Sequence, residues 1–117
     1  MSHKIMIVDD DPEIVSYLKE LLEDNGYATC VATDGSQALD IVRQENPDLI
    51  TLDLEMPDEW GPRFYRRLSQ HDALRSIPVI VISGLSGSKY AIPRAVASLN
   101  KPFDKDELLR LITQTLG

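Results

Sequence analysis

The sequence is poor in cysteine and has no long apolar run. Its one thiol, Cys30, cannot form an internal disulfide, and its neighbours indicate a strand, where we expect a buried structural side chain. The first residues lead directly into a short apolar stretch followed by acids, which is unlike a signal peptide. A membrane-spanning helix needs about 20 apolar residues in succession. We therefore expect a soluble, cytoplasmic protein that has no contact with a membrane.

Basic residues are also few, since 12 Lys and Arg stand against 19 Asp and Glu, for a formal net charge of -7. Binding to a nucleic-acid backbone needs clustered cations that displace counterions. The basic residues here are scattered, so we expect no direct nucleic-acid binding by this domain. The pair Arg66 and Arg67 could contact an acidic partner, although a solvated helix face is the more common role of such a pair.

The chain lacks a P-loop and a Gly-rich dinucleotide fingerprint, and neither His3 nor His71 has the spacing of a catalytic triad or a metal site. Its 117 residues, 43% of them hydrophobic and 26% charged, are typical of one globular domain with one core. We see no internal repeat or linker. The prediction is a single domain over residues 1–117.

Apolar segments rich in β-branched residues alternate with amphipathic segments along the whole chain. The expected strands cover residues 4–8, 27–32, 48–52, 77–82 and 98–100, and the expected helices cover residues 12–24, 35–45, 62–71 and 104–116. Alternation of this kind implies right-handed crossovers and a parallel sheet covered on both faces. The fold class is therefore α/β, with a doubly wound five-stranded parallel sheet.

Charged residues follow three of the predicted strands: Asp9 and Asp10 the first, Asp53 the third and Lys101 the fifth. In a doubly wound sheet of order 2-1-3-4-5, ligands bind at the carboxyl ends between strands 1 and 3. Crowded carboxylates repel one another, and Mg²⁺ is a counter-ion suited to oxygen ligands. A carboxylate beside this metal can attack a phosphoryl group and form an acyl phosphate, while a lysine offsets charge.

Four segments carry a resemblance to the response regulator receiver family of two-component signalling. They are IMIVDDDPEI (5–14), DLEMPDEWG (53–61), VIVISG (79–84) and NKPF (100–103), in the order and at nearly the spacing found in that family. The resemblance extends over almost the whole chain and implies the flavodoxin-like sheet order 2-1-3-4-5. It also implies a cis bond between Lys101 and Pro102, and open space beside the acceptor at Gly84.

The resemblance assigns a role to each candidate site residue. Asp53 is implied to be the phosphoacceptor, and Mg²⁺ to be held by Asp9, Asp10, Asp53 and the backbone carbonyl of Glu55. Ser83 is implied to be the hydroxyl that turns toward the phosphoryl group, and Lys101 to pair with that group. The implied donor is a histidine kinase or a histidine phosphotransfer protein, and a homodimer is a possible assembly.

Each of these residues also has a more ordinary interpretation. The aspartates at 9 and 10 could belong to a capping cluster with Asp11, which we expect to cap the first helix. Asp53 could be a turn residue, Lys101 a surface lysine and Ser83 a cap. The site interpretation is favoured because carboxylates at the end of a buried strand are unfavourable without a partner.

The chain departs from the family between the fourth and fifth strands. Only 17 residues separate Ser83 from Lys101, and the segment contains Ser86-Gly87-Ser88 and Pro93, which disfavour a helix. We expect the fourth helix, within residues 86–96, to be short, irregular or mobile. Ser98 stands where the family usually has the aromatic residue of its switch. Two alternatives remain open: the shortened segment is a deletion without functional effect, or signalling output uses another face, such as the first or last helix.

Three functions remain open at the level of sequence. The leading one is a phosphorylation-dependent switch that transforms no substrate beyond its own phosphorylation and dephosphorylation, and so is not an enzyme in the usual sense. The second is a docking receiver that works without phosphorylation. The third, which is less favoured, is a Mg²⁺-dependent phosphohydrolase with an aspartyl nucleophile, for which no further acid-base carboxylate or cap domain is evident.

Overall fold

A computed structural model describes residues 3–84 and 95–117 of the chain. Five strands form one sheet in the order β2-β1-β3-β4-β5, and every neighbouring pair is parallel. The strands are β1 (Lys4–Val8), β2 (Ala28–Ala32), β3 (Leu49–Leu52), β4 (Val79–Ser83) and β5 (Ala97–Asn100). The α/β class, the parallel pairing and the strand order expected from the sequence are confirmed.

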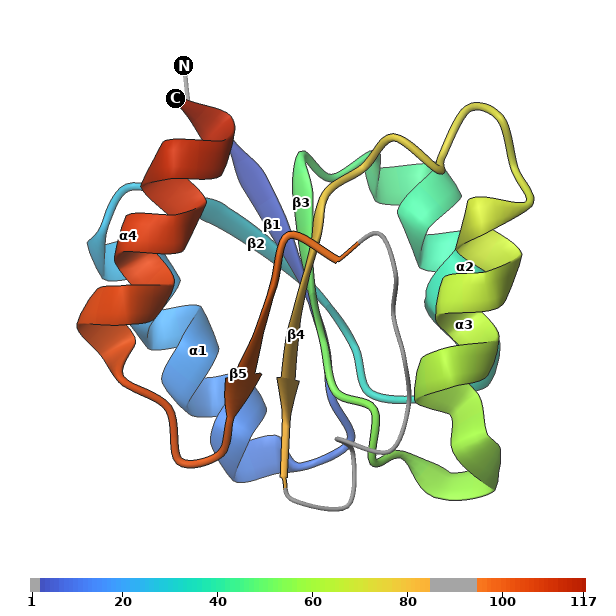
Figure 1. Ribbon diagram of the computed structural model, residues 1–117, viewed down its shortest axis with the longest axis horizontal. Coiled ribbons are helices and arrows are strands. Elements are labelled where there is room, and N and C mark those ends of the chain that lie inside the picture. Colours follow the sequence, from blue (N-terminus) through green and yellow to red (C-terminus); the bar gives the residue numbers. More distant parts are fainter. Residues whose placement is uncertain (1–2, 85–94) are drawn as a thin grey trace.

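Helices cover both faces of the sheet (Figure 1). One face is covered by α1 (Pro12–Asp24) and α4 (Lys105–Leu116), and the other by α2 (Gly35–Glu45) and α3 (Trp60–Ser69). A short turn of 3-10 helix, η1 (Pro57–Glu59), leads into α3. Among the helices described, none is both long and apolar enough to span a membrane.

Aspartates cap three of the four α-helices in the part of the chain that the structure describes. Asp11, Asp34 and Asp104 each precede a helix, and the side chain of each accepts a hydrogen bond from the backbone N–H two residues further on. This contact satisfies one of the donors that a helix start leaves unpaired, and the negative charge is favoured by the helix dipole. The capping role predicted for Asp11 is confirmed, and α2 ends at Asn46, which adopts the left-handed conformation.

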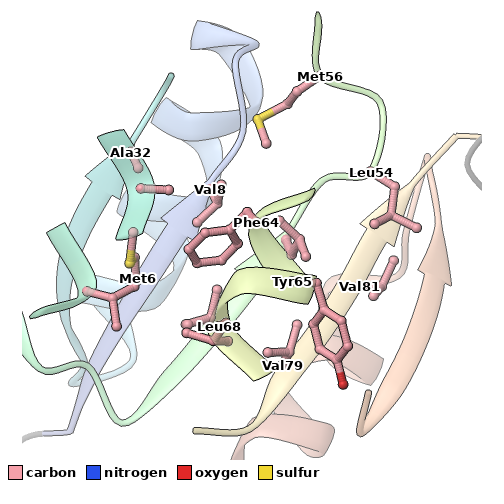
Figure 2. Packing of buried hydrophobic residues seen from close by; sticks show 14 of the residues in the cluster. Met6, Val8, Ala32, Leu54, Met56, Phe64, Tyr65, Leu68, Val79 and Val81 are labelled. Atoms are coloured by element: carbon pink, nitrogen blue, oxygen red, sulfur yellow. The ribbon is translucent and has the colours of Figure 1, made fainter. Parts of the chain in front are cut away.

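The hydrophobic core lies in two layers, one on each side of the central strands. The layer beneath α2 and α3 contains Phe64 and Leu68, which point from α3 toward strand residues such as Val8 (Figure 2). The layer beneath α1 and α4 is built on alternate residues of the same strands, including Ile5 and Ile7. Because β1, β3 and β4 are covered on both sides, they are nearly continuous in apolar residues.

Several predicted boundaries are wrong by one or two residues. The third α-helix covers 60–69 instead of 62–71, because η1 already turns the chain and Pro62 fits the first helical turn, where no N–H partner is needed. Strand β4 begins at Val79 instead of residue 77, since Pro78 lacks a donor for the sheet. Strand β2 begins at Ala28, because the N–H of Tyr27 still bonds the end of α1 at Leu22.

Smaller corrections concern the remaining elements. Strand β3 begins one residue later than predicted, at Leu49, strand β5 begins one residue earlier, at Ala97, and α4 starts at Lys105 after its cap. Cys30 is half-buried on the edge strand β2, less enclosed than predicted, and burial still raises the pKa of its thiol. The prediction of an irregular helix within residues 86–96 falls mainly on residues 85–94, outside the part that the structure describes.

Candidate functional site

The predicted site residues meet at the carboxyl end of the sheet. Asp9 directly follows β1, Asp53 follows β3, Ser83 ends β4 and Lys101 follows β5. Backbone hydrogen bonds continue the sheet pairing into this rim: the N–H of Asp53 donates to Val8, and the N–H of Lys101 donates to Ser83. Parallel strands in register therefore bring residues far apart in the sequence to one place.

Three carboxylates lie close enough to share a cation. Oxygen atoms of Asp9, Asp10 and Asp53 all fall within 4.8 Å of one another. Asp9 is 2% exposed and Asp53 is 3% exposed, whereas Asp10 is open to solvent. The cluster therefore has a buried floor and one accessible edge.

Lys101 supplies positive charge to the buried part of this cluster. Its Nζ lies 3.0 Å from Oδ2 of Asp9 and 3.6 Å from Oδ1 of Asp53. Burial opposes the charge on this lysine, but its hydrogen bond to Asp9 and the nearby carboxylates together raise its pKa above the ordinary value. Lys101 is thus held as a cation against both buried aspartates. The bond between Lys101 and Pro102 is cis, as expected.

Asp53 is the aspartate whose ionisation the site disfavours. Burial raises the pKa of its carboxyl to about 6, and the negative charges of Asp9 and Asp10 act in the same direction. A hydrogen bond from the backbone N–H of Glu55 and the charge of Lys101 oppose this rise in pKa. Without a further cation, one lysine does not offset three carboxylates.

The donor set fits a hard divalent cation. All the side-chain ligands available in the cluster are carboxylate oxygens, which such cations prefer. Neighbouring N–H groups fix two of the carboxylates, since Oδ1 of Asp9 accepts from the backbone N–H of Asp11 at 2.9 Å and Oδ1 of Asp53 accepts from that of Glu55 at 2.9 Å. Oriented carboxylates with one exposed edge can bind an ion and still admit a ligand.

The side chain of Glu55 fills the place that was expected to be open at Gly84. A Cβ atom added at Gly84 would meet Oε1 of Glu55, so the expectation of open space there is wrong. The hydroxyl of Ser83, which is 4% exposed, donates to the same Oε1 at 3.4 Å. Only the backbone carbonyl of Glu55 was assigned a role from the sequence, and the direction of its side chain depends on tertiary contacts.

Two further residues tie α3 to the site. Gly61 lies so close to the loop after β3 that a Cβ there would be 2.5 Å from the backbone oxygen of Asp53 and 2.6 Å from Cα of Leu54. Trp60 packs against Gly35 at the start of α2 and, with Asp10, Asp34 and Asp58, lines a hollow of about 350 Å³. Neither Trp60 nor Gly61 was among the site residues predicted from the sequence.

The fold and the site together define a class of protein. In this class, a doubly wound parallel sheet carries an acidic cluster and a lysine at the carboxyl ends of its strands. The model of the response regulator receiver domain family matches residues 5–113. The chain belongs to this family of signalling domains, as its sequence motifs predicted.

Relatives and solved structures agree with this assignment. The chain is 36% identical over 117 residues to protein Rrf1 of Nitratidesulfovibrio vulgaris, covering all of this chain and 85% of Rrf1. It is 31% identical over 121 residues to the polar-differentiation response regulator DivK of Brucella anthropi, covering all of this chain and 98% of DivK. The crystal structure of a response regulator receiver domain from Bermanella marisrubri superposes with a TM-score of 0.88 at 30% identity, over the full length of both chains.

Proposed function

We propose that Asp53 is the residue that accepts a phosphoryl group in this receiver domain. The observation that carries the proposal is the cluster itself, in which the carboxylates of Asp9, Asp10 and Asp53 lie within 4.8 Å of one another and Lys101 contacts two of them. Asp53 is at the centre of this arrangement, because it pairs with Lys101 and is affected by the charge of both other aspartates. A nucleophile needs a partly enclosed position of this kind, next to groups that offset charge.

Mg²⁺ is the proposed cofactor, held by Asp9, Asp10, Asp53 and the backbone carbonyl of Glu55. When bound, it would offset charge on the oxygens of the incoming phosphoryl group. The carboxylates at 9 and 53 are already oriented by backbone N–H groups, which lowers the cost of arranging them around an ion. Asp10 is the exposed member and provides the edge through which the ion and the ligand enter.

The proposed donor is the phosphohistidine of a histidine kinase or a histidine phosphotransfer protein. An oxygen of Asp53 attacks phosphorus, the P–O bond forms as the P–N bond breaks, and the imidazole leaves with the electron pair and takes up a proton. The ammonium of Lys101 stays within reach of the transferred group, since it already lies 3.6 Å from Oδ1 of Asp53. As the charge on phosphorus-bound oxygens develops, Lys101 stabilises it.

Ser83 and Glu55 are proposed to report the modification to the rest of the domain. The hydroxyl of Ser83 donates to the Glu55 carboxylate, and a phosphoryl group on Asp53 offers a competing acceptor with more negative charge. Ser98 is exposed on β5 and cannot supply the large aromatic side chain that usually follows this movement in the family. The proposed switch therefore acts through the loop after β3 and the start of α3, where Gly61 contacts the backbone of Asp53.

Acetyl phosphate offers a direct test of the proposed acceptor. Wild-type protein incubated with acetyl phosphate and Mg²⁺ is expected to gain the mass of one phosphoryl group, and to lose this gain when EDTA replaces Mg²⁺. The variant Asp53→Asn is expected to remain unmodified. The matched control is Asp11→Asn, which removes a neighbouring charge outside the cluster while asparagine still caps α1.

The same assay separates the alternatives. Absence of any mass gain in the wild type, with Mg²⁺ binding intact, would favour a docking receiver that works without phosphorylation. Rapid release of phosphate from added phosphate esters over many turnovers would favour a phosphohydrolase. Equal modification of the wild type and Asp53→Asn would place the acceptor on another residue and would refute the proposal.

A further inference from the structure

The exposed face of α3 gathers three arginines. Arg63, Arg66 and Arg67 are spaced at i, i+3 and i+4, which places them on neighbouring turns of one face. With Gln70, they line a shallow hollow of about 280 Å³. The opposite face of the helix is buried through residues such as Phe64. The arginines therefore lie on the solvent side of a firmly packed helix.

None of these three arginines forms an ion pair with a carboxylate among the residues whose side chains the structure describes. By contrast, Arg43 lies 3.8 Å from Asp40, and Arg75 lies 3.5 Å from Asp72. The segment 60–71 contains no Asp or Glu at all, although the chain has a net charge of -7. Among the described side chains, this patch of positive charge has no carboxylate partner, which is a local exception in an acidic protein.

Trp60 holds two of the three arginines in place. The guanidinium carbon of Arg63 lies 4.8 Å from the centre of the indole ring, and that of Arg67 lies 5.3 Å from it. Arg63 also donates to the backbone oxygen of Asp58 at 3.5 Å. Stacking on an aromatic ring restricts a long side chain and leaves the edge of the guanidinium free to donate. Less rotamer freedom is then lost when an acceptor binds.

We propose that this arginine face of α3, made of Arg63, Arg66 and Arg67, docks an acidic segment of a partner protein. Guanidinium groups bind carboxylates through two parallel hydrogen bonds, and three of them on one face match a short run of Asp or Glu. The proposal goes beyond the acceptor chemistry of Asp53 and does not depend on it, since the arginines are exposed and arranged without any modification of the site.

Other anionic partners fit the surface less well. The three side chains extend over about one turn of helix, roughly 6 Å, whereas proteins that bind duplex nucleic acid contact its closely spaced phosphates with more cations over a longer stretch. The net charge of -7 would repel a nucleic-acid backbone from the rest of the surface. An amphipathic membrane-binding helix needs exposed apolar side chains beside its cations. On α3, Phe64, Tyr65 and Leu68 are buried, and Trp60 is partly buried and lies under the guanidinium groups of Arg63 and Arg67.

Hexaglutamate peptide is a suitable probe for this surface. We expect the peptide, titrated into the full chain at low ionic strength, to shift the NMR signals of the side-chain Nε–H groups of Arg63, Arg66 and Arg67 most strongly. Arg66→Glu is expected to weaken binding about tenfold. Arg110→Glu is the matched control, because Arg110 is also an exposed helical arginine without an ion pair among the described residues and the change in net charge is the same. Arg110→Glu should bind like the wild type.

Several outcomes would overturn the proposal. Equal weakening by Arg66→Glu and Arg110→Glu would show a response to net charge alone, and shifts concentrated outside α3 would place the peptide elsewhere. Tighter binding of a short DNA duplex or of anionic lipid vesicles at the same arginines would assign the face to another class of partner. Self-association of the protein that disappears in Arg66→Glu would make a second copy the occupant. Circular dichroism of both variants checks that each remains folded.

Discussion

The ammonium of Lys101 lies 3.0 Å from Oδ2 of Asp9, although 92 positions separate the two residues in the sequence. The contact crosses the sheet, because Asp9 follows β1 and Lys101 follows the edge strand β5. A lysine in this position shares the carboxylate that a divalent cation would bind. Lys101 and the cation therefore both act on the negative charge of the Asp9 carboxylate.

Replacing Lys101 is expected to affect metal affinity and phosphorylation in opposite directions. In Lys101→Met, Asp9 loses a competing cation, so Mg²⁺ should bind about fivefold more tightly, equivalent to about 1 kcal/mol. The rate of modification by acetyl phosphate should fall, because no ammonium remains to stabilise the transferred group. Isothermal titration and mass spectrometry measure the two effects, with Lys105→Met on α4 as a control. Weaker Mg²⁺ binding by Lys101→Met would contradict this account of the pair.

Asp53→Asn is expected to stabilise the protein when divalent cations are absent. The pKa of this carboxyl is raised from 3.8 to about 6 in the folded protein, so the folded state keeps a proton that the unfolded state has already released. Stability should therefore fall as the pH rises from about 4 to about 6, and the variant should lack this loss. At pH 7 we expect a gain of about 2 kcal/mol in the free energy of unfolding, measured by urea denaturation in EDTA.

Mg²⁺ should reverse this order and make the wild type more stable than Asp53→Asn. Binding to the folded state alone stabilises the wild type in proportion to the logarithm of the Mg²⁺ concentration, while the variant has lost one ligand. Urea midpoints that do not differ between the two proteins at pH 7 in EDTA would show that the carboxylates do not repel one another as the geometry indicates.

Two glycines at the site are expected to respond very differently to alanine. A Cβ at Gly61 would meet backbone atoms of Asp53 and Leu54, which cannot yield, so Gly61→Ala should cost about 2 kcal/mol or more in stability. A Cβ at Gly84 would meet only the end of the Glu55 side chain, which can rotate, so Gly84→Ala should cost less than about 0.5 kcal/mol. Urea denaturation of both variants makes the comparison, and equal costs would show that Glu55 is fixed as firmly as the backbone.

Trp60 is the only tryptophan in the chain and should report cation binding through fluorescence. It shares a hollow of about 350 Å³ with Asp10, the exposed member of the acidic cluster. We expect Mg²⁺ to change its emission, and Asp10→Asn to abolish the change. Asp34→Asn is the control, because Asp34 lines the same hollow but lies outside the cluster. An unchanged response in Asp10→Asn would separate the indole from the metal site.

The sequence was sufficient to predict the elements that the core depends on most. Strands β1, β3 and β4 appear as apolar runs because both of their faces are buried, and the acids after β1 and β3 mark the rim where ligands bind. The helix start after Asp11 follows from local capping chemistry. These features depend on neighbours in the sequence, or on the general geometry of parallel sheets, and both can be deduced without coordinates.

Two other features could not be deduced from the sequence. The helix start at Trp60 follows from the turn at Asp58, whose backbone is left-handed with φ of 59°. The position of the Glu55 side chain over Gly84 depends on how two loops meet. By contrast, the stacking of Arg63 and Arg67 on Trp60 could have been predicted, because spacings of three and seven residues place all three side chains on one helical face.

The most direct test of the central claim is to locate the acyl phosphate chemically. Borohydride reduces an aspartyl phosphate to homoserine, so protein treated with acetyl phosphate and Mg²⁺, then reduced and digested, should yield homoserine at position 53 alone. The yield should disappear in EDTA and in Asp9→Asn, if the carboxylates after β1 and β3 form one cation site. Homoserine at position 9 or 10, or equal yields with and without Mg²⁺, would contradict the account.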